Sequence, residues 1–330
     1  MKKIQSLERI LYIRTDKIGD TLMNIPALRL LRQTYPKSWI TLLCDVGVAG
    51  LFQGHPDIDE VMAVDASSLK LDKNARRELL RRIKSARFGL AVISTSDKFF
   101  HWASFIAGIP HRAGWRRKWG FFLNHSLKDD KKSDVSHEID SNLRLVELVS
   151  DLKWDGSMPL AVAPETKAKI EDFLYRSAPH QAVIAMHIGT TNPKKRWPAE
   201  RFSELSDRIQ SENGPRIVLV GGLDERLTAA EISRRTRLPL VDATGLFSLA
   251  ELAAFLGSPK VKALISADSG PAHIAWMQGT PTVVFFAKDL PGSNPSRWGP
   301  RDGKSEIIEK KVSEISADEA FGALERVLSK

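Results

Sequence analysis

The sequence contains little cysteine and no long apolar run, and both shortages narrow the class of protein. Cys44 is the single cysteine among 330 residues, so the chain forms no internal disulfide and no cysteine-rich zinc module. No window approaches the roughly 20 apolar residues of a membrane span, and the charged N-terminus lacks the apolar stretch of a secretory signal. We therefore expect a soluble protein of a reducing, cytoplasmic compartment.

The glycine-rich fingerprint of dinucleotide-binding folds is also missing. The loop after the first apolar run reads Arg14-Thr-Asp-Lys-Ile-Gly-Asp20 and holds one glycine, Gly19, which disfavours a nicotinamide enzyme. The histidines show no His-Glu-x-x-His spacing, and the one Asp-x-Asp, Asp57-Ile-Asp59, leads into an apolar strand pattern. We expect neither a metal site nor a cofactor.

The sequence does have a surplus of positive charge. Its 49 Lys and Arg against 40 Asp and Glu give a net charge of +9. Residues 1–165 hold 26 of these basic residues against 20 acidic ones, so the first half is the more basic. Such a surplus favours anionic partners such as nucleic acid, phosphorylated metabolites or an anionic membrane surface, although solubility alone also explains it.

Short apolar runs alternate with longer helical patterns in both halves of the chain. We expect strands at Ile10–Arg14, Trp39–Cys44, Glu60–Val64, Gly89–Ser94, Ala182–His187, Ile217–Val220, Ala263–Ser266 and Thr282–Phe286. Periodicity fades around residues 153–164, where Gly and Pro accumulate. The pattern predicts two α/β domains, 1–160 and 161–330, each with a doubly wound parallel sheet. A final helix over 316–329 is a candidate to pack back on the first domain.

Ligands of open α/β sheets bind beyond the carboxyl ends of the strands, so the loops there are candidate sites. In the first such loop, Asp20 follows Gly19 at a helix start, where a capping role and a catalytic-base role both fit. Pro26 predicts that the regular helix begins near Ile25 or is kinked there. Residues 15–24 are then expected to be partly free for function.

The second candidate loop follows the strand that opens the second domain. The hydroxyls of Thr190 and Thr191 and the cations of Lys194, Lys195 and Arg196 are typical of a diphosphate cradle, because phosphates accept charge-assisted hydrogen bonds. A solvated basic loop is the alternative.

The third candidate loop runs from Ile265 to His273. Ser269 is a natural N-cap and Pro271 a natural early helix residue, so free amides around Gly270 would form an anion site. His273 lies in the first turn of this helix and is either a ligand contact or a core histidine.

Taken in order, these segments resemble glycosyltransferase family 9, the ADP-heptose:lipopolysaccharide heptosyltransferases. The matching stretches are Ile13–Arg32 (IRTDKIGDTLMNIPALRLLR), Lys195–Phe202 (KRWPAERF), Val220–Glu225 (VGGLDE), Asp268–Ala275 (DSGPAHIA) and Gly279–Thr282 (GTPT). The resemblance runs end to end. It implies two facing Rossmann-like domains of the GT-B type, the first binding mainly the acceptor and the second mainly the nucleotide sugar.

The resemblance also implies roles for individual residues. Asp20 would be the base of an inverting transfer, with Gly19 beside the acceptor. The implied donor contacts are Thr190, Thr191, Lys195, Glu225 (or Asp224), Asp268, Ser269, Gly270 and His273. Lys195 and the helix start at Gly270 would neutralise the leaving diphosphate, so that no metal is required.

The implied reaction moves a heptose from ADP-heptose to a lipopolysaccharide inner-core acceptor. Ser94-Thr95-Ser96 stands where many members of the family have an Asp-Leu-Gln-like turn, so the acceptor is the least transferable part. The alternatives are a related transferase with another nucleotide-sugar donor, or with a protein or natural-product acceptor, and a non-enzymatic binder of anionic sugars or nucleic acid.

The densest basic and aromatic stretch is His111–Leu123. Its cations are Arg112, Arg116, Arg117 and Lys118, which are interleaved with Trp and Phe. Cations attract anionic lipids and aromatic rings favour the membrane interface. We expect this stretch to bind an anionic lipid-linked acceptor and to hold the enzyme peripherally at the inner face of the cytoplasmic membrane, with no nucleic-acid partner. The alternative is that its aromatic rings face the core and its arginines are solvated.

Overall fold

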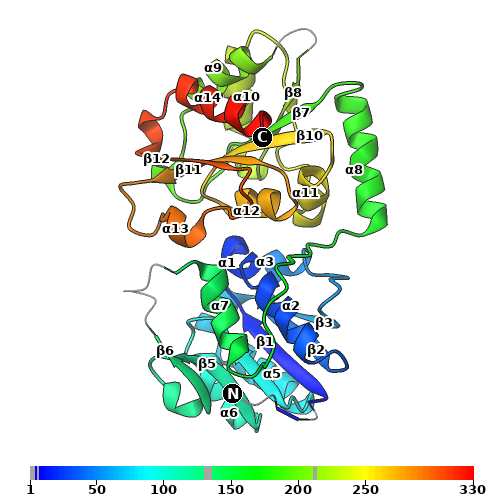
Figure 1. Ribbon diagram of the computed structural model, residues 1–330, viewed down its shortest axis with the longest axis vertical. Helices are drawn as coiled ribbons and strands as arrows, with labels where there is room; N and C mark the ends of the chain where they lie inside the picture. The colour runs from blue at the N-terminus through cyan, green and yellow to red at the C-terminus, as the bar shows by residue number, and fades with distance from the viewer. Residues whose placement is uncertain (1–3, 6, 130–135, 211–213) are drawn as a thin grey trace. The chain divides into compact units, whose positions relative to one another are not determined.

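The computed structural model describes residues 4–5, 7–129, 136–210 and 214–330 of a chain that divides into two compact units, Met1–Ala161 and Val162–Lys330. A six-stranded parallel sheet forms the centre of each unit (Figure 1). The strands of the first unit are β1 Arg9–Arg14, β2 Trp39–Asp45, β3 Glu60–Val64, β4 Leu90–Ile93, β5 His111–Arg116 and β6 His125–Lys128. Those of the second are β7 Val183–His187, β8 Arg216–Val220, β9 Val241–Asp242, β10 Val261–Ala267, β11 Thr282–Ala287 and β12 Glu306–Lys310.

Both sheets have the same topology. The strand order is β3-β2-β1-β4-β5-β6 in the first unit and β12-β11-β10-β7-β8-β9 in the second. Read from each unit's own first strand, both are the 3-2-1-4-5-6 order of the Rossmann fold. The predicted pair of doubly wound parallel sheets is thus confirmed. The strand order reverses between β1 and β4 and between β7 and β10, where this topology places ligand sites.

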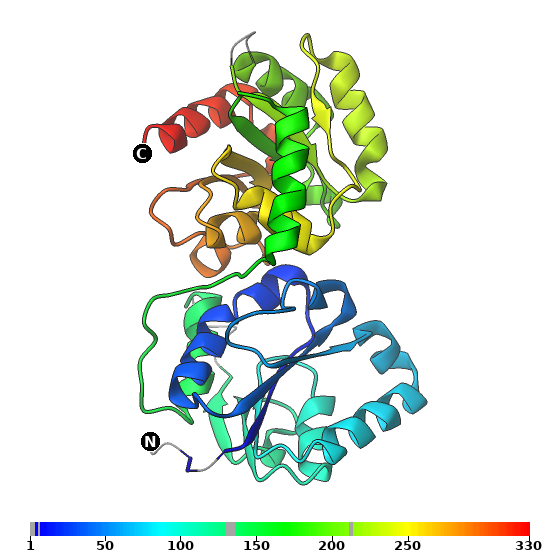
Figure 2. The same cartoon turned by 90° about the vertical axis from the view of Figure 1, so that its right-hand side faces the viewer.

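Helices cover both faces of each sheet (Figures 1 and 2). The first unit contains α1 Ile18–Leu22, α2 Ile25–Thr34, α3 Val46–Ala49, α4 Ala66–Leu71, α5 Lys73–Ser85, α6 Phe99–Ile106 and α7 Glu138–Glu147. The second contains α8 Pro164–Ser177, α9 Ala199–Ile209, α10 Arg226–Arg235, α11 Leu249–Leu256, α12 Gly270–Met277, α13 Pro295–Trp298 and α14 Ala317–Leu328. Short 3-10 turns are η1 Gly120–Phe122, η2 Pro193–Lys195, η3 Leu223–Glu225 and η4 Val312–Glu314.

The apolar residues of the central strands explain the layering. In the first unit, Leu11 and Ile13 of β1 pack with Ile83 of α5 and Phe100 of α6 in one buried cluster. Ile10 and Tyr12, the neighbours of Leu11 in β1, point to the opposite face of the sheet, because side chains alternate along a strand. Both faces of β1 are therefore buried, which is why its sequence is a continuous apolar run.

All eight expected strands are present, but four others were not predicted. Three of the four, β6, β9 and β12, lie at sheet edges, and β12 alternates between exposed and half-buried residues. An edge strand buries little side-chain surface, so its sequence lacks the apolar run that reveals a central strand.

The final helix packs within its own unit. The α14 helix contacts α9, β10, β11 and β12 of the second unit. Among the described residues, no helix is long and apolar enough to cross a membrane.

Candidate active site

In the first unit, polar side chains converge where β1 and β4 end. Arg14, the last residue of β1, is only 5% exposed. Its Nη1 donates to the backbone oxygen of Ser94, the residue after β4, over 2.9 Å, and also reaches the Ser94 hydroxyl at 3.0 Å. The guanidinium therefore bridges the two strands at which the order of the sheet reverses.

Three carboxylates share this one guanidinium. Arg14 Nη2 lies 2.8 Å from Asp20 Oδ1, and Arg14 Nε lies 2.8 Å from Asp16 Oδ2. The buried Glu138, the first residue of α7, places Oε1 at 3.3 Å from Nη1. The Asp20 side chain is 31% exposed, so its carboxylate is open to a ligand from one side while Arg14 holds the other.

The structure corrects one expectation about this loop. Asp20 is the third residue of α1 and Lys17 occupies the N-cap position, so the capping role suggested for Asp20 is wrong. Within residues 15–24, which were expected to be partly free, Ile18–Leu22 forms α1. The expected start of the next helix is correct, since α2 begins at Ile25 with Pro26 in its first turn.

Burial raises the pKa of Asp20 above its ordinary value. The Arg14 charge acts in the opposite direction, whereas Asp16 and Glu138 add to the increase. Burial disfavours a carboxylate because it removes water from the charge. A carboxylate with a raised pKa is a stronger base, which suits proton abstraction from a hydroxyl.

A buried amide fixes the backbone around Asp20. Asn24 Nδ2 donates to the carbonyl of Asp20 over 2.7 Å, and the Tyr12 hydroxyl donates to Asn24 Oδ1 over 2.7 Å. Asn142 of α7 adds a bond from Nδ2 to the carbonyl of Met23 at 3.1 Å. These bonds join α1 to β1 and α7 and limit the movement of Asp20. Arg14, Glu138 and this pair of asparagines were not predicted as site residues from the sequence.

The second unit repeats the arrangement where β7 and β10 end. His187, the last residue of β7, pairs in register with Ser266 of β10, and Nδ1 lies 3.0 Å from the Ser266 hydroxyl. The same Nδ1 lies 3.2 Å from the hydroxyl of Ser269. Burial lowers the pKa of His187 to about 4, so the ring is neutral at physiological pH.

Lys195 and Asp268 come from different loops and form an ion pair. Lys195 ends η2 in the loop after β7, and its ammonium contacts Asp268 Oδ2. Asp268 follows β10 directly, and its Oδ2 also accepts a hydrogen bond from the Ser293 hydroxyl at 3.2 Å. Lys195 is 19% exposed and Asp268 is 7% exposed, so the pair is held at the base of the loop.

His273 faces the same carboxylate. Trp276 Nε1 donates to His273 Nδ1 over 3.3 Å. An indole nitrogen only donates, so His273 Nδ1 is the acceptor in this contact. The other ring nitrogen, Nε2, is 3.9 Å from Asp268 Oδ1. His273 is thus a buried, partnered histidine that also lies beside the candidate donor loop.

The amides at the start of α12 are not capped by the residue expected to cap them. Ser269 occupies the N-cap position with extended backbone, but its side chain caps no amide of the helix. Its hydroxyl lies instead 2.9 Å from the hydroxyl of Ser266. The first amides of α12, at Gly270 and beyond, thus receive no side-chain cap from Ser269, and such a helix start favours an anion.

Of the two acidic candidates after β8, Glu225 is the one that reaches the candidate loop. Glu225 Oε2 accepts from the amide of Gly222 over 2.8 Å, while Asp224 is exposed. A Cβ at Gly189 would lie 2.8 Å from the Glu225 carboxyl carbon, so this glycine permits the close approach. The adjacent Thr190 hydroxyl accepts from the amide of Asn192 at 3.2 Å. Thr191, the other candidate hydroxyl, is exposed.

The cations of the 111–123 stretch differ in their surroundings. Arg112 donates to the carbonyl of Phe122 over 2.6 Å, and burial lowers its pKa. Arg117 forms an ion pair with Asp129 at 2.5 Å. Arg116 and Lys118 are exposed.

The aromatic rings of this stretch also differ in their exposure to solvent. Trp115 is 1% exposed, so the core alternative is correct for this ring. Phe121 is 78% exposed and Trp119 is 37% exposed, so that alternative is wrong for them. An aromatic surface therefore remains next to Arg116 and Lys118.

The Asp-x-Asp pair belongs to the scaffold. Asp57 Oδ1 lies 3.0 Å from Arg29 Nη1, and Asp59 pairs with Arg32. In the part of the chain that the structure describes, no group of three or more His, Cys, Asp or Glu side chains is arranged to hold a metal ion.

Two doubly wound units, each with a polar cluster where its strand order reverses, have the GT-B type of fold. A family model identifies the group within this class: the chain belongs to glycosyltransferase family 9 (heptosyltransferase), whose model matches residues 76–321. Lipopolysaccharide heptosyltransferase 2 of Escherichia coli K12 is 22% identical over 91% of this chain and 87% of that protein.

Two solved structures share the fold. The family 9 glycosyltransferase of Veillonella parvula has a TM-score of 0.86 and 23% identity over 99% of both chains. Escherichia coli heptosyltransferase WaaC with ADP-2-deoxy-2-fluoro heptose has a TM-score of 0.73 and 17% identity, over 96% of this chain and 99% of that chain.

Proposed function

We propose that this glycosyltransferase moves a heptose from ADP-heptose to an inner-core acceptor of lipopolysaccharide, with inversion at the anomeric carbon. The observation that carries the proposal is the partly exposed Asp20 carboxylate held by Arg14 at the carboxyl end of β1. The names of the relatives support the substrates: one is a lipopolysaccharide heptosyltransferase, and another was solved with a fluorinated ADP-heptose.

Asp20 acts as the general base. An acceptor hydroxyl attacks the anomeric carbon while ADP leaves, and the hydroxyl proton passes to the Asp20 carboxylate. The bond to ADP breaks as the new glycosidic bond forms, so inversion follows from a single displacement. Arg14 orients the carboxylate, and the raised pKa of Asp20 strengthens it as a base.

The second unit supplies the groups that accept the departing negative charge. Lys195 and the amides that begin α12 bind the diphosphate, because a cation and a helix N-terminus both favour anions. Lys195 then exchanges its contact with Asp268 for one with phosphate. The further donor contacts in this proposal are Thr190, Thr191, Glu225, Asp268, Ser269, Gly270 and His273. These groups carry the charge without a metal ion.

The acceptor side of the proposal rests on the first unit. Gly19 lies next to the base, and the exposed Arg116 and Lys118 contact anionic groups of the acceptor. Arg112 and Arg117 contribute by shaping the surface through their intramolecular bonds. With Phe121 exposed beside them, these cations hold the enzyme peripherally on an anionic membrane.

The reaction is tested with purified enzyme, ADP-heptose and a heptose-deficient inner-core acceptor. We expect a product that forms only with ADP-heptose and whose new linkage has the opposite anomeric configuration to the donor. Adding EDTA should not change the rate. A panel of nucleotide sugars tested for protection against thermal unfolding compares other donors directly. Stronger protection by a non-ADP sugar, or an EDTA-sensitive rate restored by magnesium, would contradict the proposal.

Membrane contact is tested separately with vesicles. The double variant Arg116→Ser/Lys118→Ser should lose salt-sensitive binding to anionic vesicles, because each cation near such a surface contributes about 1 kcal/mol. The control Lys37→Ser/Lys167→Ser removes the same charge from two other exposed positions. Equal losses in both double variants would show that only net charge matters.

A further inference from the structure

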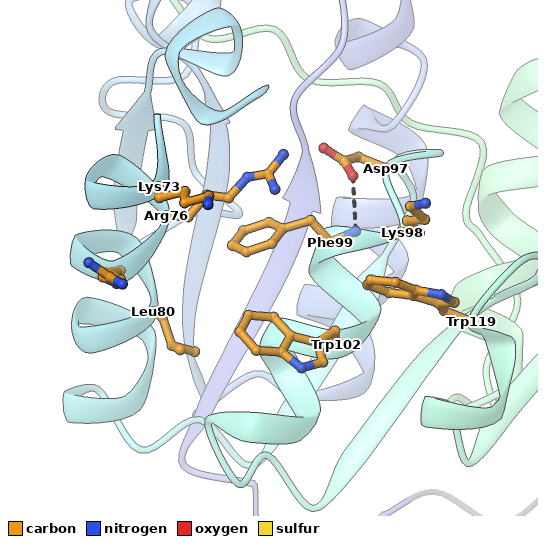
Figure 3. Close-up of a pocket in the computed structure, with 9 residues that line it drawn as sticks. Lys73, Arg76, Leu80, Asp97, Lys98, Phe99, Trp102 and Trp119 are labelled. Carbon is orange, nitrogen blue, oxygen red and sulfur yellow. Dashed lines mark hydrogen bonds between the residues drawn. The ribbon is translucent and has the colours of Figure 1, made fainter. Parts of the chain in front are cut away.

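A pocket of about 340 Å³ lies in the first unit between α5 and α6 (Figure 3). Its walls are Leu80 of α5, Phe99 and Trp102 of α6, and Trp119. The volume is within the range of roughly 300–1,000 Å³ that small-molecule pockets have. Trp119 belongs to the 111–123 stretch, whereas Leu80, Phe99 and Trp102 lie outside the donor and acceptor residues assigned above.

Four cations line the same pocket: Lys73, Arg76, Arg77 and Lys98. The single acidic side chain in the lining, Asp97, accepts a hydrogen bond from the Phe99 amide at 2.9 Å (Figure 3). The pocket thus holds four positive charges and one carboxylate that already accepts a hydrogen bond, and this balance favours an anionic ligand.

The cations and the aromatic rings are interleaved. The Arg76 guanidinium lies 5.2 Å from the centre of the Phe99 ring, and the Lys98 ammonium lies 4.9 Å from that of Trp119. A cation over an aromatic face is held there by the ring's charge distribution. The pocket therefore presents charge and apolar surface to the same occupant.

Trp119 adopts an unusual backbone conformation in this position. Its φ is +71°, in the left-handed region that few residues with a side chain occupy. Such conformations persist where the surrounding structure holds them and cluster at functional sites. The strained backbone places a large ring beside Lys98 instead of in the core.

The pocket continues into an exposed aromatic surface. Trp119 contacts Phe122 with ring centres 6.2 Å apart, and Phe122 in turn contacts the exposed Phe121 at 4.3 Å and Phe105 at 5.1 Å. Exposed aromatic residues next to cations are typical of a surface that meets lipid.

We propose that this pocket binds a single anionic lipid of the bilayer. The lipid phosphate contacts Lys73, Arg77 and Lys98, since phosphates accept charge-assisted hydrogen bonds from such groups. The start of one acyl chain lies against Leu80, Trp102 and Trp119. An anionic lipid matches both halves of the lining, because its acyl chain is apolar like the walls and its phosphate carries the negative charge that the cations attract.

Binding is measured by titration calorimetry with dodecyl phosphate below its micelle concentration, without donor or acceptor. We expect saturable binding with one site per chain. Inorganic phosphate, which has no chain, and dodecyl maltoside, which has no charge, should bind at least about tenfold more weakly. Equal binding of either probe would overturn the proposal, because one half of the lining would then contribute nothing.

Paired variants locate the site. Arg77→Ser/Lys98→Ser should weaken dodecyl phosphate binding at least about tenfold, whereas Arg81→Ser/Lys84→Ser removes the same charge from exposed positions of α5 outside the pocket and should change it little. Leu80→Trp fills the volume and keeps every charge, and it should also abolish binding. Trp119→Gly removes one wall while suiting the positive φ, so its loss of binding is not explained by misfolding.

The lipid proposal and the transfer proposal fail separately. Leu80→Trp should keep its rate with a chainless acceptor, because Leu80 is not among the residues assigned to donor or acceptor binding. Binding of dodecyl phosphate that is unaffected by Leu80→Trp would overturn the pocket assignment, whatever the rate of transfer.

Discussion

Arg14 Nη2 lies 2.8 Å from Asp20 Oδ1, and the same guanidinium also contacts Asp16 and Glu138. One positive charge thus serves three carboxylates, so the group keeps a net negative charge. Arg14 orients Asp20 without fully stabilising its charged form, and burial raises the Asp20 pKa. A carboxylate that is both oriented and basic is what hydroxyl deprotonation requires.

Asp20→Asn should reduce turnover by roughly 10²-fold or more and leave donor affinity within a few fold. The amide has nearly the same shape but accepts no proton. Turnover is measured at saturating donor and acceptor, and donor affinity by calorimetry. Near-normal turnover would end the assignment of Asp20 as the base.

Asp16→Asn is the matched control for this variant. Asp16 contacts the same guanidinium through Nε at 2.8 Å but has no role as the base in the proposal. It should retain most of the turnover. A loss equal to that of Asp20→Asn would mean that both variants act by disturbing Arg14.

The acidic limb of the pH–rate profile should report the ionisation of Asp20. The base must be deprotonated, so the rate falls as the pH falls through the Asp20 pKa, which burial places above the ordinary value of about 3.9. Glu138→Gln removes a buried negative charge that raises this pKa. The limb of log kcat against pH should therefore move to lower pH in Glu138→Gln, with little change in the plateau rate.

A purely structural role for Glu138 gives a different result. Loss of packing would lower the plateau rate and the thermal midpoint and leave the position of the limb unchanged. A limb that stays in place in a folded Glu138→Gln enzyme would contradict the electrostatic role.

Lys195→Ala should weaken donor binding and also slow the chemical step, because its charge counts most as negative charge develops on ADP. Loss of Lys195 also leaves the Asp268 carboxylate, 7% exposed, without its ammonium partner. Lys194→Ala is the control, since Lys194 is the exposed neighbour in the same turn. If Lys194→Ala weakened donor binding and slowed the reaction while Lys195→Ala changed neither, the diphosphate contact would have to be assigned to Lys194 instead.

The central strands other than β5 were predictable, because strands buried on both faces are continuous apolar runs. The central strand β5, HRAGWR, was not, since charged residues interrupt its apolar pattern. Edge strands such as β6 and β12 were not, since their half-exposed polar residues resemble a loop. The position of Asp20 in its loop was also predictable from the motif. Its place inside α1 was not, because a five-residue helix gives too short a pattern to separate from a turn.

The partners of the site residues were the least predictable part of the molecule. Glu138 is 118 residues from Asp20 in sequence, and only the packing of α7 brings it to Arg14. The same holds for Ser293 and Asp268, which are joined by the fold of a loop after β11. Motifs identify residues that contact ligands, but a buried side chain that supports them has no local signature.

The buried His187 should make the stability of the second unit depend on pH. Its native pKa is about 4, while an unfolded histidine has a pKa near 6.5. The unfolded state therefore binds more protons between these values, so the stability present above pH 6.5 is lost as the pH falls toward 4. The loss between pH 7 and 4.5 should be on the order of 2–3 kcal/mol from this residue.

Urea unfolding of the wild type and of His187→Gln at several pH values measures this contribution. The burial-lowered histidines of the first unit, His55, His101 and His125, affect both proteins equally, so the difference in slope isolates His187. We expect the free energy of unfolding of His187→Gln to fall less steeply between pH 6.5 and 4.5. In the wild type, the ring carbon resonance of His187 should also show no titration above pH 5.5. Parallel slopes, or a midpoint near pH 6.5, would mean that the ring is hydrated and charged, and that its contacts with Ser266 and Ser269 do not hold the donor loop in solution.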